Sequence, residues 1–139
     1  MPDTNIMVSI RWKKSKTTTY NINYHIIWCV KYRRKLLTDY VDIRLKELIL
    51  EKSKEIDIII KKMETDKDHI HLFIKANPTQ AIHWIVQQLK GYTSRILRKE
   101  LSIVRTRVPS LWTRSYYVET IGHISEKTIL KYIEEQRNH

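Results

Sequence analysis

The sequence has a single cysteine and lacks any long hydrophobic run. Because Cys29 is the only cysteine among 139 residues, an intramolecular disulfide and a zinc site built on several cysteines are both excluded. This cysteine usage fits a reducing, intracellular compartment. No apolar run approaches the roughly 20 residues of a membrane-spanning helix, and the N-terminus lacks the hydrophobic core of a signal peptide. We therefore expect a soluble, cytoplasmic protein with no membrane-spanning segment.

Acidic residues are also scarce. There are 15 Asp and Glu residues against 26 Lys and Arg residues, which gives a formal net charge of +11 at pH 7. So large an imbalance on a small chain predicts a polyanionic partner, nucleic acid first and an anionic membrane second. The hydrophobic content of 42% is enough for one ordinary domain with its own core.

Two histidines stand two positions apart in a stretch that is typical of a β-strand. Side chains of a strand alternate between its faces, so His69 and His71 share one face with Phe73, and three apolar residues point the other way. Burial of the apolar side would leave both imidazoles facing open space, where they would form half of a metal site. The alternative is a pair of surface histidines without a ligand.

The hydrophobic periodicity predicts alternating strands and helices. A strand from Tyr20 to Val30 precedes a helix over residues 40–55 that Asp39 would cap. Residues 56–64 predict a second strand, and a turn at Asp66-Lys67 leads into the histidine strand. A helix that begins near Asn77 and ends near residue 100, a basic connection over 101–111 and a strand over 112–121 complete this part.

This order of elements predicts an α+β fold of the ferredoxin-like type, with the split βαβ arrangement found in RRM-like domains and an added C-terminal helix. We expect residues 1–18 to form a basic N-terminal arm and residues 19–139 to form one domain. An antiparallel sheet with both helices on one face leaves its other face available for a ligand. The same fold also serves as a non-enzymatic nucleic-acid-binding module that stacks bases on its sheet.

The predicted C-terminal helix carries a second group of chemically useful side chains. Ile129, Tyr132, Ile133 and Gln136 recur at helical spacing and share one stripe. Tyr132 is therefore a candidate nucleophile one turn away from a carboxamide. The alternative is a tyrosine that packs in the core or in an interface.

Five blocks of the sequence resemble the small single-tyrosine HUH transposases of the insertion sequence 200/605 family, which move as single-stranded DNA. The blocks occur in the family's order and cover nearly everything from Tyr20 onward. They are Tyr24-His25-Ile26-Ile27-Trp28-Cys29-Val30-Lys31-Tyr32-Arg33-Arg34, Asp68-His69-Ile70-His71-Leu72, Leu89-Lys90-Gly91-Tyr92-Thr93-Ser94-Arg95, Leu111-Trp112-Thr113-Arg114-Ser115-Tyr116-Tyr117 and Lys131-Tyr132-Ile133-Glu134-Glu135-Gln136.

The resemblance implies a role for each candidate residue. His69 and His71 would bind a divalent cation, Gln136 would supply a third ligand, and Tyr132 would attack the scissile phosphate through a 5′-phosphotyrosine intermediate. The family implies Mg²⁺ or Mn²⁺, although nitrogen and oxygen ligands of this kind would also accept Zn²⁺ or Ni²⁺. Tyrosine has an ordinary pKa of about 10, so the nucleophile needs the metal or a base beside it.

The resemblance also implies partners. Family members are homodimers whose active sites combine the histidine pair of one subunit with the tyrosine helix of the other, and Gly122 would be a hinge or a simple turn before that helix. They bind subterminal DNA hairpins. Residues that would contact phosphates are Lys31, Arg33, Arg34, Lys90, Arg95 and Arg114. A domesticated protein or a replication-type HUH nickase would share this chemistry and differ in substrate.

Overall fold

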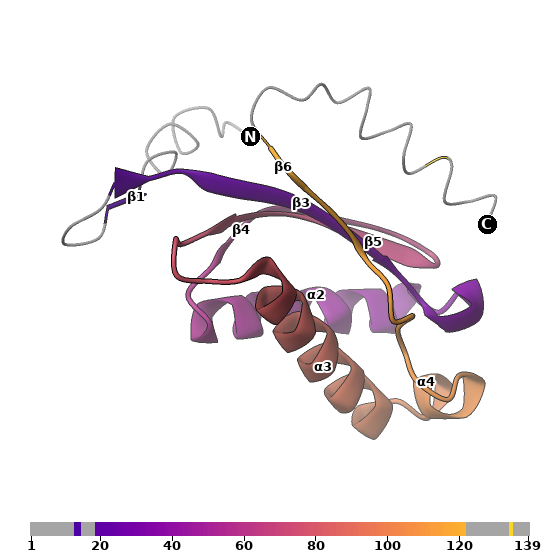
Figure 1. The fold of residues 1–139 in the computed structure, drawn as a ribbon. Helices are drawn as coiled ribbons and strands as arrows, with labels where there is room; N and C mark the ends of the chain where they lie inside the picture. Colours follow the sequence, from indigo (N-terminus) through magenta and orange to yellow (C-terminus); the bar gives the residue numbers. More distant parts are fainter. Residues whose placement is uncertain (1–12, 15–18, 122–133, 135–139) are drawn as a thin grey trace.

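The structure is a computed structural model, which describes residues 13–14, 19–121 and 134. Within these residues, a four-stranded antiparallel sheet is built from β3 (Ile22–Cys29), β4 (Ile59–Asp66), β5 (His69–Ala76) and β6 (Tyr117–Thr120) in the order β4-β5-β3-β6. Helices α2 (Asp39–Glu55) and α3 (Ile82–Glu100) lie together on one face of this sheet (Figure 1). The predicted ferredoxin-like arrangement is confirmed.

Shorter elements complete the described part of the chain. Strands β1 (Lys13–Lys14) and β2 (Thr19–Tyr20) pair antiparallel with each other. Lys13 and Lys14 are the described residues of the predicted arm. A 3-10 helix, η1 (Lys31–Arg33), follows β3, and α4 (Ser102–Arg107) follows α3. No helix among the described residues is long and apolar enough to cross a membrane.

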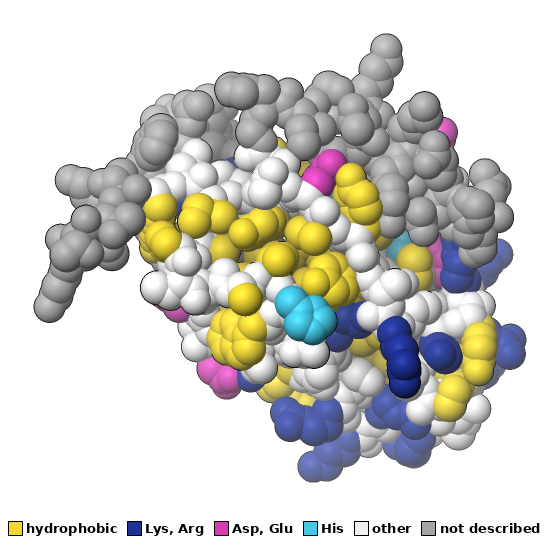
Figure 2. Space-filling model, in the orientation of Figure 1, with side chains coloured by type: hydrophobic (Ala, Val, Ile, Leu, Met, Phe, Trp, Pro, Cys, Tyr) yellow, Lys and Arg dark blue, Asp and Glu magenta, His cyan; other side chains and the backbone are white. Residues whose placement is uncertain are grey.

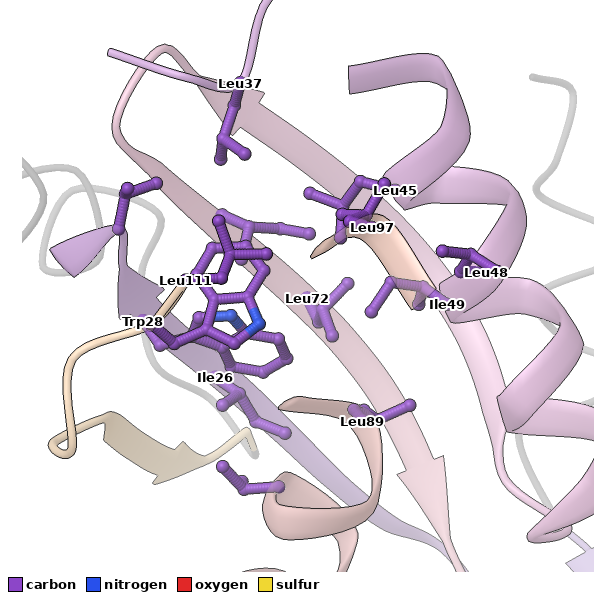
Figure 3. Close-up of a cluster of buried hydrophobic side chains, with 14 of the residues drawn as sticks. Ile26, Trp28, Leu37, Leu45, Leu48, Ile49, Leu72, Leu89, Leu97 and Leu111 are labelled. Atoms are coloured by element: carbon purple, nitrogen blue, oxygen red, sulfur yellow. The ribbon is translucent and has the colours of Figure 1, made fainter. Parts of the chain in front are cut away.

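The alternation of side chains in β5 determines where the core lies. Ile70, Leu72 and Ile74 are fully buried on the helix side, as predicted. Figure 3 shows Leu72 among side chains from β3, α2 and α3. Those neighbours are Ile26, Trp28, Leu45, Leu48, Ile49, Leu89 and Leu97. The apolar side of the histidine strand therefore fixes the strand in the sheet and directs His69 and His71 to the opposite face.

Several predicted boundaries in the first half are wrong by a few residues. Asp39 does not cap α2, because it is already the first helical residue, with a φ of 48°, and Thr38 occupies the N-cap position. The second strand begins at Ile59 because Ile56 still closes α2 through its N–H bond to the Lys52 carbonyl. The hairpin turn consists of Lys67 and Asp68, one residue later than predicted, because Asp66 pairs with His69.

Element boundaries in the second half of the chain also differ from the predicted ones. The reciprocal contacts of Asn77 and Gln80 form, at 2.9 Å between the Asn77 N–H and Gln80 Oε1, but they close a turn before α3 begins at Ile82. The predicted basic connection contains α4, which buries Val104. The last strand is shorter than predicted. Trp112 makes an isolated bridge to Val30 and donates its indole N–H to Thr93 Oγ1 at 2.9 Å instead.

Candidate metal centre

The two histidines of β5 lie side by side on the sheet face that points away from α2 and α3. Their ring centroids are 5.2 Å apart and the rings are nearly parallel, at 28°. The prediction that they face open space is wrong, since His69 is 1% exposed and His71 is 7% exposed. The same face carries Ile27 directly opposite His71, and Ile27 packs with Phe73 and Tyr117. The pair is therefore an interior feature, which disfavours the surface-histidine alternative.

A carboxylate and a guanidinium hold His69 in place. His69 Nδ1 lies 2.8 Å from Asp68 Oδ1, and Asp68 Oδ2 accepts a hydrogen bond from Arg33 Nη2 at 3.2 Å. Nε2 of His69 is buried and has no hydrogen-bond partner among the described residues. A neutral imidazole that donates from Nδ1 to a carboxylate presents a lone pair at Nε2, which is how metal-binding histidines are commonly oriented.

Burial keeps His71 in the form that binds metals. Loss of hydration lowers the pKa of His71 to about 4, and the neighbouring His69 adds to the decrease, whereas Glu64 across the strand pair acts in the opposite direction. A buried imidazole loses solvation most in its charged form, so the neutral ring is favoured. At neutral pH, His71 is therefore an unprotonated nitrogen donor.

This burial predicts that the metal-free protein is destabilised by acid. The unfolded chain binds a proton at His71 near pH 6.5, whereas the folded protein binds it only near pH 4. The protonation of His71 therefore leaves the free energy of unfolding unchanged above pH 6.5. As the pH falls from 6.5 to 4, the free energy of unfolding decreases by up to about 3 kcal/mol, at 1.36 kcal/mol per pKa unit. Urea titrations at several pH values measure the free energy of unfolding, with His71→Asn as the comparison. Parallel curves for the two proteins would contradict this prediction.

The sequence analysis missed a third imidazole on the same face. His25 of β3 is fully buried. Its ring stacks on Phe73 at 4.3 Å and lies 5.8 Å from the ring of His71. Nδ1 of His25 lies 3.4 Å from Glu119 Oε1 of β6. The strict alternation of the first strand already placed His25 on the face opposite the apolar side chains. Only the sheet register shows that His25 lies across from Phe73 and therefore near His71.

Four of the predicted phosphate contacts gather near the end of the sheet where His69 lies. Lys31 and Arg33 belong to η1, and Arg34 is exposed directly after it. Arg114 is exposed in the segment before β6, and the neighbouring Thr113 N–H bonds to the carbonyl of Cys29, the strand partner of His69. In the face shown in Figure 2, Lys and Arg gather mainly to the right and below.

The other two predicted contacts have different surroundings. Nζ of Lys90 donates to the carbonyls of Thr113, at 2.5 Å, and Ser115, at 3.2 Å. Burial lowers the pKa of Lys90 to about 8. Arg95 is exposed on α3 and lies over the ring of Tyr92. Lys90 therefore anchors the segment that carries Arg114, whereas Arg95 is directly available to a ligand.

Two of the predicted metal ligands, His69 and His71, lie among the described residues. They contain no group of three or more His, Cys, Asp or Glu side chains arranged to hold a metal ion. Tyr132 and Gln136, predicted as nucleophile and third ligand, lie outside the described residues. The residues present nevertheless fit a divalent cation, because His69 offers a buried nitrogen without a partner and His71 is held neutral beside it.

Together, fold and site define a ferredoxin-like α+β protein with a carboxylate-supported histidine pair on the sheet face opposite its helices. The sequence matches the family described as "Transposase IS200 like" over residues 18–136. The chain belongs to this family of IS200-like transposases.

Individual relatives agree with this membership. The chain is similar to the ISDra2 transposase TnpA of Deinococcus radiodurans, with 32% identity over 97% of this chain and 98% of the relative. It is also similar to the transposase for insertion sequence element IS200 of Salmonella typhimurium, with 27% identity over 86% of this chain and 79% of the relative.

Solved structures share the fold. The crystal structure of a protein from Deinococcus radiodurans R1 assigned as a transposase superposes with a TM-score of 0.80 at 30% identity, covering 89% of this chain and 97% of the other. A REP-associated tyrosine transposase bound to a REP hairpin superposes with a TM-score of 0.59 at 12% identity, covering 83% and 67%. The second likeness concerns the fold alone.

Proposed function

We propose that this transposase cleaves and rejoins single-stranded DNA at the ends of an insertion sequence, by metal-assisted transesterification through a 5′-phosphotyrosine intermediate. The observation that carries the proposal is the arrangement around His69. Its Nδ1 is held by Asp68, its Nε2 is buried without a partner among the described residues, and neutral His71 lies beside it. In a member of the IS200-like transposase family, this arrangement is best explained as a metal site for phosphate chemistry.

His69 and His71 would hold the cation, Mg²⁺ or Mn²⁺, and Gln136 would complete the set of protein ligands. When bound, a divalent cation polarises a phosphoryl oxygen and stabilises the charge that develops there. Neutral ligands suit this task because they leave the positive charge of the cation undiminished. Asp68 fixes the His69 tautomer, and Arg33 in turn holds Asp68 through the contact at 3.2 Å.

Tyr132 would perform the covalent step. Its oxygen forms a bond to the scissile phosphorus as its proton leaves, the bond from phosphorus to the 3′ oxygen breaks, and that oxygen takes up a proton to become a free 3′-OH. A 3′-OH from another DNA end then attacks the phosphotyrosine and releases the tyrosine. Because the phosphotyrosine ester retains the energy of the broken phosphodiester, rejoining needs no ATP.

The DNA would bind at the basic end of the sheet. The REP-associated tyrosine transposase that shares this fold is bound to a hairpin, and Lys31, Arg34 and Arg114 lie near the histidine end of β5. We therefore propose that a subterminal hairpin contacts this side. A homodimer in which the tyrosine helix of one subunit completes the histidine site of the other would follow the family's arrangement.

The test of this function is a covalent adduct. Wild-type protein incubated with hairpin-bearing single-stranded DNA and Mn²⁺ should give a protein–DNA adduct that resists denaturation, and chelation with EDTA should prevent it. The substrates are imperfect palindromes taken from DNA that flanks the gene. Hairpin binding without any adduct, on every end and with either metal, would instead support a non-enzymatic nucleic-acid-binding protein. Adducts only on replication-origin DNA would indicate a nickase.

A further inference from the structure

We propose that His25 and Glu119 form a positioning pair that restricts the rotation of the His71 ring and so keeps it directed toward the metal. The inference rests on the proposed metal centre and assigns a task to two residues of β3 and β6. Three imidazoles, those of His25, His69 and His71, lie on one sheet face. The ring of His71 has His69 at 5.2 Å and His25 at 5.8 Å.

The register places His25 and His69 on opposite sides of His71. His69 lies across from Cys29, and His25 lies across from Phe73, two positions beyond His71 along β5. Phe73 fixes His25 by stacking on its ring, with the ring centroids 4.3 Å apart and an angle of 11° between the ring planes. A rigid imidazole on this side limits the directions in which the ring of His71 can turn.

Each outer imidazole is held by a carboxylate that is itself held by a second group. His69 contacts Asp68, which accepts from Arg33. On the other side, His25 contacts Glu119 at 3.4 Å, and Glu119 Oε2 accepts from the hydroxyl of Tyr117 at 2.8 Å. Only Asp68 supports a proposed metal ligand directly. Glu119 instead fixes His25, so His71 lies between two imidazoles that are both held in place.

A second observation points to a ligand at this face. Nε2 of His25 and Nε2 of His69 are both buried, and neither has a hydrogen-bond partner among the described residues. Buried polar atoms in folded proteins are nearly always satisfied. Here two such Nε2 atoms lie on one sheet face, and the Nδ1 atom of each ring is already against a carboxylate. A hydrated cation beside His71 would supply the missing partners of both Nε2 atoms.

The test measures Mn²⁺ affinity by calorimetry on the full chain with bound hairpin DNA. Glu119→Gln, which keeps the size of the side chain and removes its charge, and His25→Phe, which keeps a ring on Phe73, should each weaken Mn²⁺ binding about 10-fold. The double variant should bind about as weakly as either single variant, because the pair acts as a unit. Cleavage should recover as Mn²⁺ is raised. Glu47→Gln, on the surface of α2 beside Arg44, is the matched control.

A merely structural pair would behave differently. Lower melting temperatures with wild-type Mn²⁺ affinity in both variants would overturn the inference. If His69→Ala loses Mn²⁺ while Glu119→Gln and His25→Phe bind it as wild type does, the metal centre stands and the positioning pair alone fails. If wild-type protein binds no Mn²⁺, both proposals fail.

Discussion

Replacement of either β5 histidine should abolish DNA cleavage and leave hairpin binding nearly unchanged. His69→Ala and His71→Ala each remove a nitrogen donor from the proposed metal site. Metal stabilisation of phosphoryl transfer contributes several kcal/mol, and each 1.36 kcal/mol is a tenfold change in rate. We therefore expect cleavage to slow by about 1,000-fold or more in single-turnover assays, with the hairpin dissociation constant within about twofold of wild type.

Hairpin affinity should persist because it depends mainly on contacts between phosphates and basic side chains, which these variants retain. His83→Ala is a suitable control, since His83 is an exposed histidine of α3 whose Nδ1 lies 3.1 Å from the hydroxyl of Tyr116. It should cleave at the wild-type rate. Equal losses of cleavage and hairpin binding in the two β5 variants would mean that His69 and His71 support the fold rather than the chemistry.

Tyr132→Phe should remove the covalent adduct completely. Phenylalanine keeps the ring and lacks the oxygen that would bond to phosphorus, so no phosphotyrosine can form. Binding of Mn²⁺ and hairpin DNA should remain at wild-type levels, because the histidines and the basic residues are unchanged. Denaturing gel electrophoresis with end-labelled DNA measures the adduct, and strand transfer should disappear with it.

The appropriate comparison is a tyrosine elsewhere on the protein. Tyr40→Phe changes an exposed residue of α2, 56% accessible, and should form the adduct as wild type does. An adduct in Tyr132→Phe would rule out Tyr132 as the nucleophile. Loss of Mn²⁺ binding in that variant would show instead that the tyrosine helps to build the metal site.

Much of the fold was predictable because it depends on local patterns. The alternation in β5 identified Ile70, Leu72 and Ile74 as core residues, and all three are fully buried. Boundaries were less predictable, because they depend on contacts between elements. The last strand was predicted to begin at Trp112, for example, but the indole of Trp112 bonds to Thr93 of α3, and β6 begins at Tyr117.

The sequence by itself determined that His69 and His71 share a face, because strand periodicity is a property of a single segment. It also identified the family, through blocks spread along the chain. Only the tertiary structure decided that the pair is buried, that Asp68 and Arg33 support one side of it, and that His25 and Glu119 lie on the other. These contacts join β3, β5, β6 and η1, and they exist only once the sheet brings distant segments into register.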